Sequence, residues 1–235
     1  MVNAKAPKPA ARLIARTAII GLFVVMQAVL VFFVRYDTLD MDIRPNTLPS
    51  PDFYGTIDIG QTFVAEGANI GRIDLLFGTH GYSASYPIGF ELFETGPSRT
   101  LVASSGIDAS ALSNNLFNTF RFPTVRRTRG KTYLLRLSAP SATGENAMAV
   151  WMNEGDVYPS GMMMYNGVLG PGDLIFRVYS RRTIVSELGR IVRKNPGFLG
   201  SPVFFLFVIL LLEAALIWTL ASIVDRIFER RGPDV

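Results

Sequence analysis

Two apolar segments lie near opposite ends of this chain, and they constrain its fold more than any other feature. Thr17 to Val34 contains 18 residues without a charge, and Pro202 to Val224 is a second apolar segment with a single acid, Glu213. A helix needs about 20 apolar residues to cross roughly 30 Å of hydrocarbon. The sequence therefore predicts two transmembrane helices, over 12–34 and 198–224, with the chain between them folded on one side of a bilayer.

The charges beside the first apolar segment indicate its orientation. Four basic residues precede it, Lys5, Lys8, Arg12 and Arg16. Only Arg35 directly follows it, and basic flanks favour the cytoplasmic side. No small-x-small cleavage site follows, which favours an uncleaved anchor over a cleavable signal peptide. We therefore expect a bacterial inner-membrane protein with both tails, 1–11 and 225–235, in the cytoplasm and a periplasmic or extracellular central domain.

The central region shows the alternation that is typical of β-strands. Over about 55–180, short runs of β-branched and aromatic residues are separated by Gly-, Pro- and Asn-containing turns. Ile73, Leu75 and Phe77, for example, share one face of such a run. We expect an all-β domain over 55–180, an antiparallel jelly roll or β-sandwich. Residues 35–54, with prolines and acids in no regular period, are expected to form a linker.

Residues 181–197 change to the period of an amphipathic helix. The apolar positions on one face are Ile184, Val185, Leu188, Ile191 and Val192. Arg190, Arg193 and Lys194 lie off that face, as in a juxtamembrane helix that contacts lipid headgroups. The alternative is a helix that packs beneath the sandwich.

The distribution of charge narrows the choice of partners. The chain carries a formal net charge of +4, but the stretch from Tyr36 to Ser180 has 10 basic and 14 acidic residues, a net of −4. The mildly acidic domain argues against nucleic acid and leaves membrane lipid as the partner of the basic flanks. Cysteine is absent and histidine occurs once, so we expect neither a metal site nor a cofactor.

Glu213 is the most costly residue of the predicted membrane segments. A carboxylate near the middle of a bilayer costs about 2.5–3.5 kcal/mol. Gln27 reaches a similar depth if the two helices run antiparallel, so a hydrogen bond between the two is possible. We expect Glu213 and Gln27 to form a docking point for a partner membrane protein. A lone neutral acid and a proton relay are the alternatives.

Aromatic and polar residues gather in the later loops of the central domain. They are Trp151, Asn153, Glu154, Tyr158 and Tyr165, with Tyr82 and Tyr86 in an earlier loop. Aromatic faces can stack on the apolar face of a sugar, while amides and carboxylates bind its hydroxyls. The pattern predicts a glycan-binding site. The alternative places Trp151 in the core.

Signals of catalysis are few. No nucleophile motif or phosphate-binding motif occurs. Glu91 and Glu94 are a carboxylate pair by type, but their spacing places them on opposite faces of one strand. The basic turn over 126–131 is typical of a solvated hairpin end. We therefore expect no enzyme, with a saccharide hydrolase as the lesser alternative.

Four strand sequences carry a resemblance. They are Gly60–Ala65, Ile73–Thr79, Gly130–Pro140 and Gly172–Tyr179. They resemble the carbohydrate-binding-module-like jelly-roll ectodomains of bacterial membrane glycosyltransferases and envelope polysaccharide proteins. The resemblance covers about 55–180 and implies a sandwich that recognises a glycan. Because the chain lacks a many-span catalytic portion, it implies an accessory subunit of a glycosyltransferase or a transporter. A scaffolding subunit without a ligand is the alternative.

Overall fold

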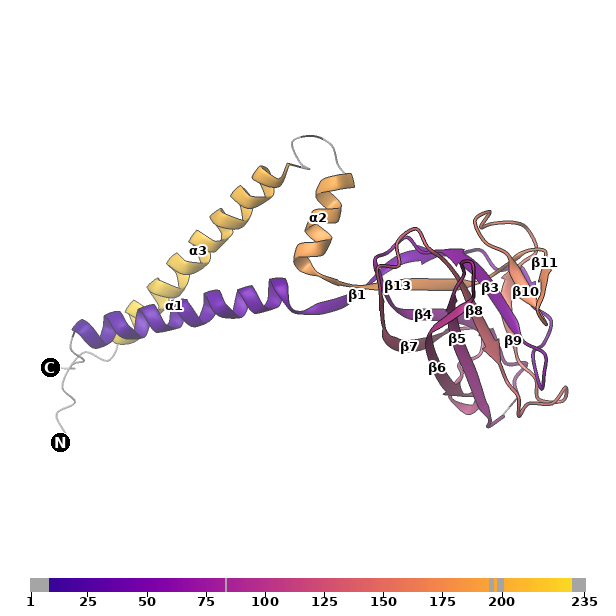
Figure 1. Cartoon of the computed structure of the whole chain (residues 1–235). Helices are drawn as coiled ribbons and strands as arrows, with labels where there is room; N and C mark the ends of the chain where they lie inside the picture. The colour runs from indigo at the N-terminus through magenta and orange to yellow at the C-terminus, as the bar shows by residue number, and fades with distance from the viewer. Residues whose placement is uncertain (1–8, 83, 195–196, 198–200, 230–235) are drawn as a thin grey trace, which may run out of the picture. The chain divides into compact units, whose positions relative to one another are not determined.

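The chain divides into two units, which are described separately below. The computed structural model describes residues 9–82, 84–194, 197 and 201–229. One unit, the helical unit, comprises Met1–Arg35 and Thr183–Val235, and the other, the β unit, comprises Tyr36–Arg182 (Figure 1).

The β unit is built from two antiparallel sheets (Figure 1). The first sheet has the strand order β1-β13-β4-β9-β12, with β7 beside β4 and β2 beside β9. Its strands are β1 (Arg35–Asp42), β2 (Leu48–Pro49), β4 (Asn69–Gly78), β7 (Phe117–Arg126), β9 (Ala149–Asn153), β12 (Asp173–Leu174) and β13 (Phe176–Thr183). The second sheet has the order β11-β10-β3-β8-β5-β6. Its strands are β3 (Ile59–Val64), β5 (Pro87–Glu94), β6 (Thr100–Asp108), β8 (Thr132–Ser138), β10 (Met163–Tyr165) and β11 (Val168–Gly170). A short 3₁₀ helix, η1 (Ala109–Ala111), lies between β6 and β7.

The core lies between the two sheets and is rich in aromatic rings. Ile73, Leu75 and Phe77 of β4 are fully buried, as their alternation predicts. Phe90 of β5 stacks on Phe120 of β7, with ring centres 5.0 Å apart, so this pair joins the two sheets. The two-sheet antiparallel arrangement is the sandwich-like fold that the strand pattern indicates.

A buried polar contact also joins the sheets. The Gln61 amide of β3 donates to Asp173 Oδ1 of β12 over 2.8 Å, and its own oxygen accepts from the Leu174 N–H over 3.0 Å. The Tyr158 N–H donates to Asp173 Oδ2 over 2.8 Å. Burial raises the pKa of Asp173, while these hydrogen bonds lower it. The carboxylate of Asp173 therefore has hydrogen-bond partners, but burial of its negative charge reduces the stability of the folded state.

Strand β1 lies in the stretch over 35–54 that was expected to be a linker. Asp40 of β1 forms an ion pair with Arg182 of β13, and both side chains are nine-tenths buried or more. Gly67 packs against the same place, because a Cβ atom there would come within 1.8 Å of Asp40 Oδ2 and of Ser180 Oγ. Asp40 is thus held by a partner on a neighbouring strand, a contact that hydropathy patterns do not reveal.

The helical unit contains α1 (Pro9–Phe32), α2 (Ile184–Lys194) and α3 (Pro202–Glu229). Helix α1 contacts both α2 and α3. Arg16 of α1 and Asp225 of α3 form an ion pair at 3.5 Å. At the start of α2, the Ser186 N–H donates to Thr183 Oγ1 over 3.3 Å, a capping contact. The amphipathic helix expected over 181–197 therefore begins later, because Arg181 and Arg182 belong to β13.

The prediction of two transmembrane helices is wrong. Within the described parts of α1, α2 and α3, no helix is both long and apolar enough to cross a membrane. Glu213 interrupts the apolar stretch of α3, and Arg16 and Asp225 border the apolar stretches of α1 and α3. The inner-membrane localisation, with cytoplasmic tails and a periplasmic domain, depended on those spans and is wrong with them.

Candidate ligand-binding cleft

Several aromatic residues proposed for glycan binding hold the β unit together. Tyr86 is buried, and its hydroxyl donates to the carbonyl of Asn146 over 2.7 Å. The Tyr158 ring packs edge-on against Phe176, and its hydroxyl accepts from the Val64 N–H over 3.0 Å. Burial raises the pKa of both phenols. Both side chains are therefore engaged in contacts within the β unit.

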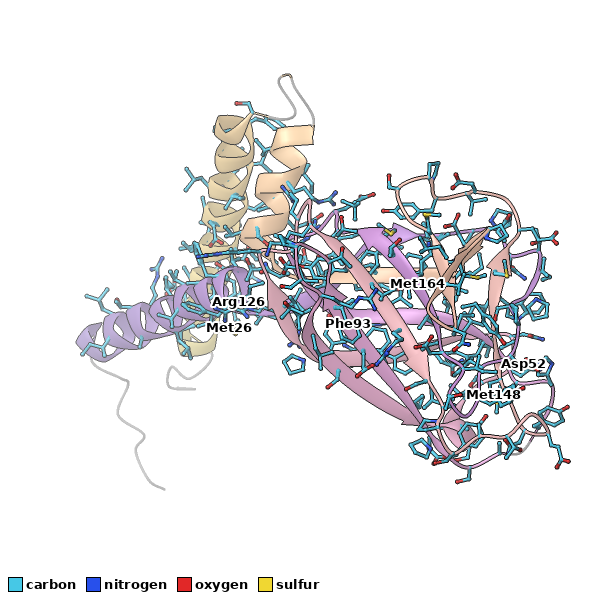
Figure 2. The ribbon with its side chains drawn as sticks, turned by 45° about the vertical axis from the view of Figure 1, so that its right-hand side comes forward. Met26, Asp52, Phe93, Arg126, Met148 and Met164 are labelled. Carbon is cyan, nitrogen blue, oxygen red and sulfur yellow. The ribbon has the colours of Figure 1, made fainter. Side chains whose placement is uncertain are left out.

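Tyr82 and Tyr165 belong to a second group, around Asp52. The Tyr165 hydroxyl donates to the Asp52 carbonyl over 3.0 Å, and His80 Nε2 lies 2.8 Å from Asp52 Oδ1. Tyr82 is about half exposed and its ring centre lies 5.8 Å from that of His80. Figure 2 shows Asp52 beside Met148, in agreement with the bridge between residues 53 and 148. The Trp151 group and the Tyr82 group thus have different partners.

Trp151, Asn153 and Glu154 lead to a cleft that the sequence did not predict. The Trp151 indole N–H donates to Asn115 Oδ1 over 2.9 Å. The Asn153 side chain donates to the Pro45 carbonyl over 2.7 Å, and the Glu154 N–H donates to Thr47 Oγ1 over 3.1 Å. These bonds position Asn115 and the segment 44–47, which together form part of the cleft wall.

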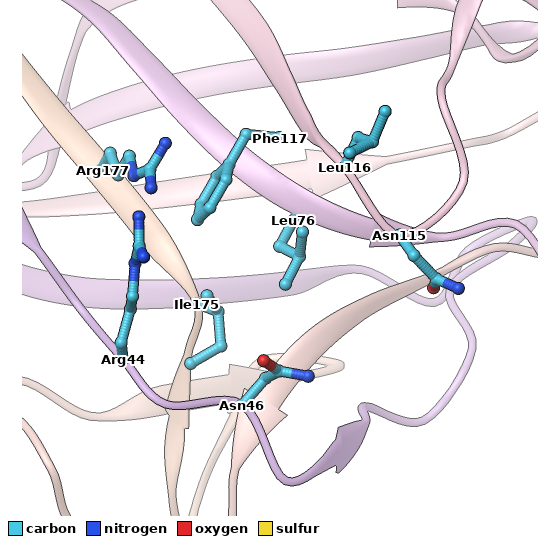
Figure 3. A pocket seen from close by; sticks show the side chains of 8 residues that line it. All are labelled: Arg44, Asn46, Leu76, Asn115, Leu116, Phe117, Ile175 and Arg177. Atoms are coloured by element: carbon cyan, nitrogen blue, oxygen red, sulfur yellow. The ribbon is translucent and has the colours of Figure 1, made fainter.

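The cleft has an apolar floor and polar ends (Figure 3). Its volume is about 200 Å³, and it is lined by Arg44, Asn46, Leu76, Asn115, Leu116, Phe117, Ile175 and Arg177. Leu76 and Phe117 are paired residues of β4 and β7, and Ile175 immediately precedes β13. Alternation places Leu76 on the opposite face of β4 from Leu75, but Leu76 and Ile175 are still buried and belong to the core, and Phe117 packs against it.

Two arginines stand at one end of the cleft and are held in place by a shared acid. Arg44 Nε and Arg177 Nε each lie 3.0 Å from Asp42 Oδ1. Figure 3 shows the two guanidinium groups pointing toward one another beside Phe117. Arg177 lies over the Phe117 ring, 3.7 Å from its centre, and Arg44 is 5.7 Å from the same centre. Two positive charges against one negative charge leave an excess positive charge here.

Two amides complete the polar rim. Asn115 adopts a positive φ of 56°, which asparagine tolerates better than most residues. Its oxygen accepts from Trp151, and among the described residues its NH₂ group has no hydrogen-bond partner, so it can donate to a ligand. Asn46 lies on the segment that Asn153 and Glu154 hold. The cleft therefore presents guanidinium and amide donors around an apolar floor.

The cleft residues give only weak signals in the sequence. Arg177 and Leu76 alternate with the apolar residues by which their strands were recognised in the sequence, so the strand pattern did not single them out. Arg44 lies in the supposed linker. The one available hint is the pair Asn114-Asn115, a turn signal between two strand patterns.

The structure gives no support to catalysis by Glu91 and Glu94. Glu91 forms an ion pair with Arg136. Glu94 binds Lys131 Nζ at 2.8 Å and lies 3.5 Å from the Tyr133 hydroxyl, whose pKa is raised to about 12 by burial and by this acid. Both carboxylates are thus engaged with cations. Among the described residues, no group of three or more metal-ligating side chains comes together.

The residues proposed for partner and lipid contacts lie in the helical unit. Gln27 is in α1 and Glu213 in α3, and no hydrogen bond joins them in the described part of the chain. Arg190 Nε donates to Glu187 Oε1 over 2.9 Å within α2. The side chains of Arg193 and Lys194 lie outside the described ones.

Comparisons with known proteins assign no family. No model of a protein family matches the chain, and no curated protein matches its sequence.

Proposed function

We propose that the β unit is a non-catalytic binding module and that the cleft between Arg44, Arg177 and Asn115 binds one sugar ring of a glycan. The combination of an apolar floor with amide and guanidinium donors supports this proposal. Sugar rings have the same division, with apolar ring faces and polar hydroxyl edges. The volume of about 200 Å³ is below the range of roughly 300–1,000 Å³ that is usual for drug-sized ligands, which favours a single ring.

Trp151 provides a reporter for the test. Its indole N–H is hydrogen-bonded to Asn115, which lines the cleft, so a ligand in the cleft should change the fluorescence of Trp151. The chain has two tryptophans, and Trp218→Phe removes the other, which is exposed on α3. Titration of this variant with a panel of mono- and oligosaccharides should give a saturable change with at least one of them.

Arg177→Gln should weaken that binding by at least tenfold, because the guanidinium is both donor and cation in the cleft. Arg99→Gln is the matched control. Arg99 is exposed on the turn between β5 and β6, away from the cleft residues. The Arg99→Gln variant should therefore bind the saccharide with the affinity of the parent protein. An unchanged affinity in Arg177→Gln, or no response to any saccharide, would refute the proposal.

A scaffolding role is a second candidate, favoured by one observation. Met162, Val168 and Leu169, on and beside the hairpin of β10 and β11, have exposed fractions of 49, 69 and 54%. Exposed apolar clusters mark protein contacts. If Val168→Ser with Leu169→Ser abolishes co-purification of a partner while saccharide titrations stay flat, scaffolding replaces glycan binding.

A further inference from the structure

A second positively charged cluster lies on the same sheet face as the cleft. Asp37 of β1 is shared by three arginines, at 2.6 Å from Arg121, 3.8 Å from Arg72 and 3.8 Å from Arg181. Arg72 also binds Asp74 at 2.6 Å. Three cations against two anions leave an excess positive charge. Arg121 and Arg181 are about half exposed, so their donors are accessible.

The strand register places the two clusters on one continuous surface. Leu76 pairs with Phe117, Asp74 pairs with Arg177 and Thr119, and Arg72 pairs with Tyr179 and Arg121. These residues alternate with those that face the second sheet, so they share the outer face of the first sheet, where Asp74 and Leu76 are themselves buried beneath their neighbours. Arg121 and Arg177 are two strands apart and are offset by two residues along the strand direction. At ordinary strand spacing their Cα atoms are roughly 12 Å apart. One sugar ring in the cleft cannot reach both arginines, but a chain of rings can.

The charge of this surface contrasts with that of the domain around it. The two clusters combine five arginines, at 44, 72, 121, 177 and 181, with three aspartates, at 37, 42 and 74. Residues 36–180 together carry a net charge of −4. A local excess of cations on an acidic domain attracts an anionic ligand to this face.

The aromatic residues of this face favour an acidic saccharide over nucleic acid. Arg72 lies over the Tyr179 ring, 4.2 Å from its centre, and Arg177 lies over Phe117. Each guanidinium group therefore covers one face of its ring, where a nucleic-acid base would otherwise stack. Arg72 already donates from Nε and Nη2 to Asp74. The described hydrogen bond of Arg177 uses its Nε, which leaves its two terminal nitrogens for the oxygens of a carboxylate.

Building on the proposed function, we propose that the ligand is an acidic polysaccharide. One uronate ring occupies the cleft with its carboxylate between Arg44 and Arg177. The following rings cross the outward face of β13, β4 and β7, so that a second carboxylate reaches Arg121.

The test uses the full chain carrying Trp218→Phe and a set of matched ligands. Tetramers of galacturonate, glucuronate and mannuronate are compared with their carboxyl-reduced counterparts and with the corresponding monomers. At least one acidic tetramer should bind about tenfold or more tightly than its reduced counterpart, and addition of about 0.5 M NaCl should diminish that difference.

Arg121→Gln separates the second cluster from the cleft. It should weaken the preferred acidic tetramer by about three- to tenfold and leave the monomer unchanged, whereas Arg177→Gln should weaken both. Asp37 keeps Arg72 and Arg181 in Arg121→Gln, so the fold should persist, which thermal unfolding checks. Arg99→Gln should affect neither ligand.

The outcomes distinguish this inference from the proposed function. If every reduced tetramer binds as tightly as its acidic counterpart, the glycan site stands and the acidic ligand is refuted. If Arg121→Gln affects monomer and tetramer equally, the extended path is refuted. If single-stranded oligothymidylate binds as tightly as the best acidic tetramer, the face is a general polyanion surface and the inference falls. No response to any saccharide refutes both.

Discussion

At the scale of single residues, close contacts and buried charges set the tolerance of the β unit to substitution. Gly67 is an example of a close contact, and Asp173 is an example of a buried charge. Neither attracted attention in the sequence, because a glycine in a turn and an aspartate after a glycine look ordinary there.

Gly67→Ala should destabilise the protein by about 3 kcal/mol, the upper end of the usual cost of overpacking. Its Cβ would meet Asp40 Oδ2 and Ser180 Oγ at 1.8 Å, and both oxygens are buried. Urea denaturation measures the change. Gly96→Ala is the control, because its Cβ would lie 3.9 Å from the nearest atom and the free energy of unfolding should change by less than about 0.5 kcal/mol. Equal effects of both substitutions would contradict the prediction.

Asp173→Asn should alter the pH dependence of stability. Burial raises the folded-state pKa of Asp173 above its ordinary value of 3.8, so the folded state binds the proton more tightly than the unfolded state. The stabilisation from the protonated acid is present below pH 3.8 and is lost as the pH rises through the folded-state pKa. Asparagine does not titrate, and it turns an NH₂ group toward the Gln61 or Tyr158 donor.

The variant should therefore be less stable than the parent, by a margin that shrinks as the pH rises from about 4 to about 7. Thermal unfolding of both proteins across that range measures the margin. A margin that grows with pH would show that the folded-state pKa is lowered instead.

At the scale of elements, the alternation of apolar and polar residues predicted the buried strands well. It did not predict β1, the strand at the edge of the first sheet. Strand β4 was recognisable because Ile73, Leu75 and Phe77 all face the core. Strand β1 was missed because its structural side chains are acids whose partners, such as Arg182, lie more than a hundred residues away. The cleft was missed for the same reason. Its arginines converge only once β1, β7 and β13 come together.

The Asp40–Arg182 pair tests how β1 is attached. Arg182→Met should destabilise the protein by about 3–5 kcal/mol, because it removes the cation that compensates a buried carboxylate. Adding Asp40→Asn removes that charge and should recover a large part of the loss. Chemical denaturation of the parent, both single variants and the double variant gives the coupling energy. A double variant no more stable than Arg182→Met alone would contradict this account.

At the scale of the whole molecule, the boundary of the β unit differs from the one that the strand pattern suggests. The structural unit begins at Tyr36, whereas the sequence placed the sandwich at 55–180. The difference matters because residues 36–54 supply Asp37, Asp40 and Asp42, the partners of six arginines. The chain therefore needs this stretch for the core edge and for the cleft.

A fragment covering 36–182 should fold cooperatively, because it contains both sheets and the whole core between them. A fragment covering 55–182 lacks β1 and β2 and therefore lacks Asp40, whose carboxylate pairs with Arg182. It should unfold at a markedly lower temperature or fail to fold. Circular dichroism and calorimetry of the two fragments provide the comparison, and equal unfolding midpoints would show that β1 is dispensable.

The sandwich begins with β1 and ends with β13, and these two strands are neighbours in one sheet (Figure 1). Asp37 meets Arg181 and Asp42 meets Arg177, so the two strands run in opposite directions, and the chain enters and leaves the sandwich at one corner. Tension applied between the two ends of the chain would consequently load this strand pair from that corner. The hydrogen bonds between β1 and β13 would then break one after another from that corner, and they would not bear the force together.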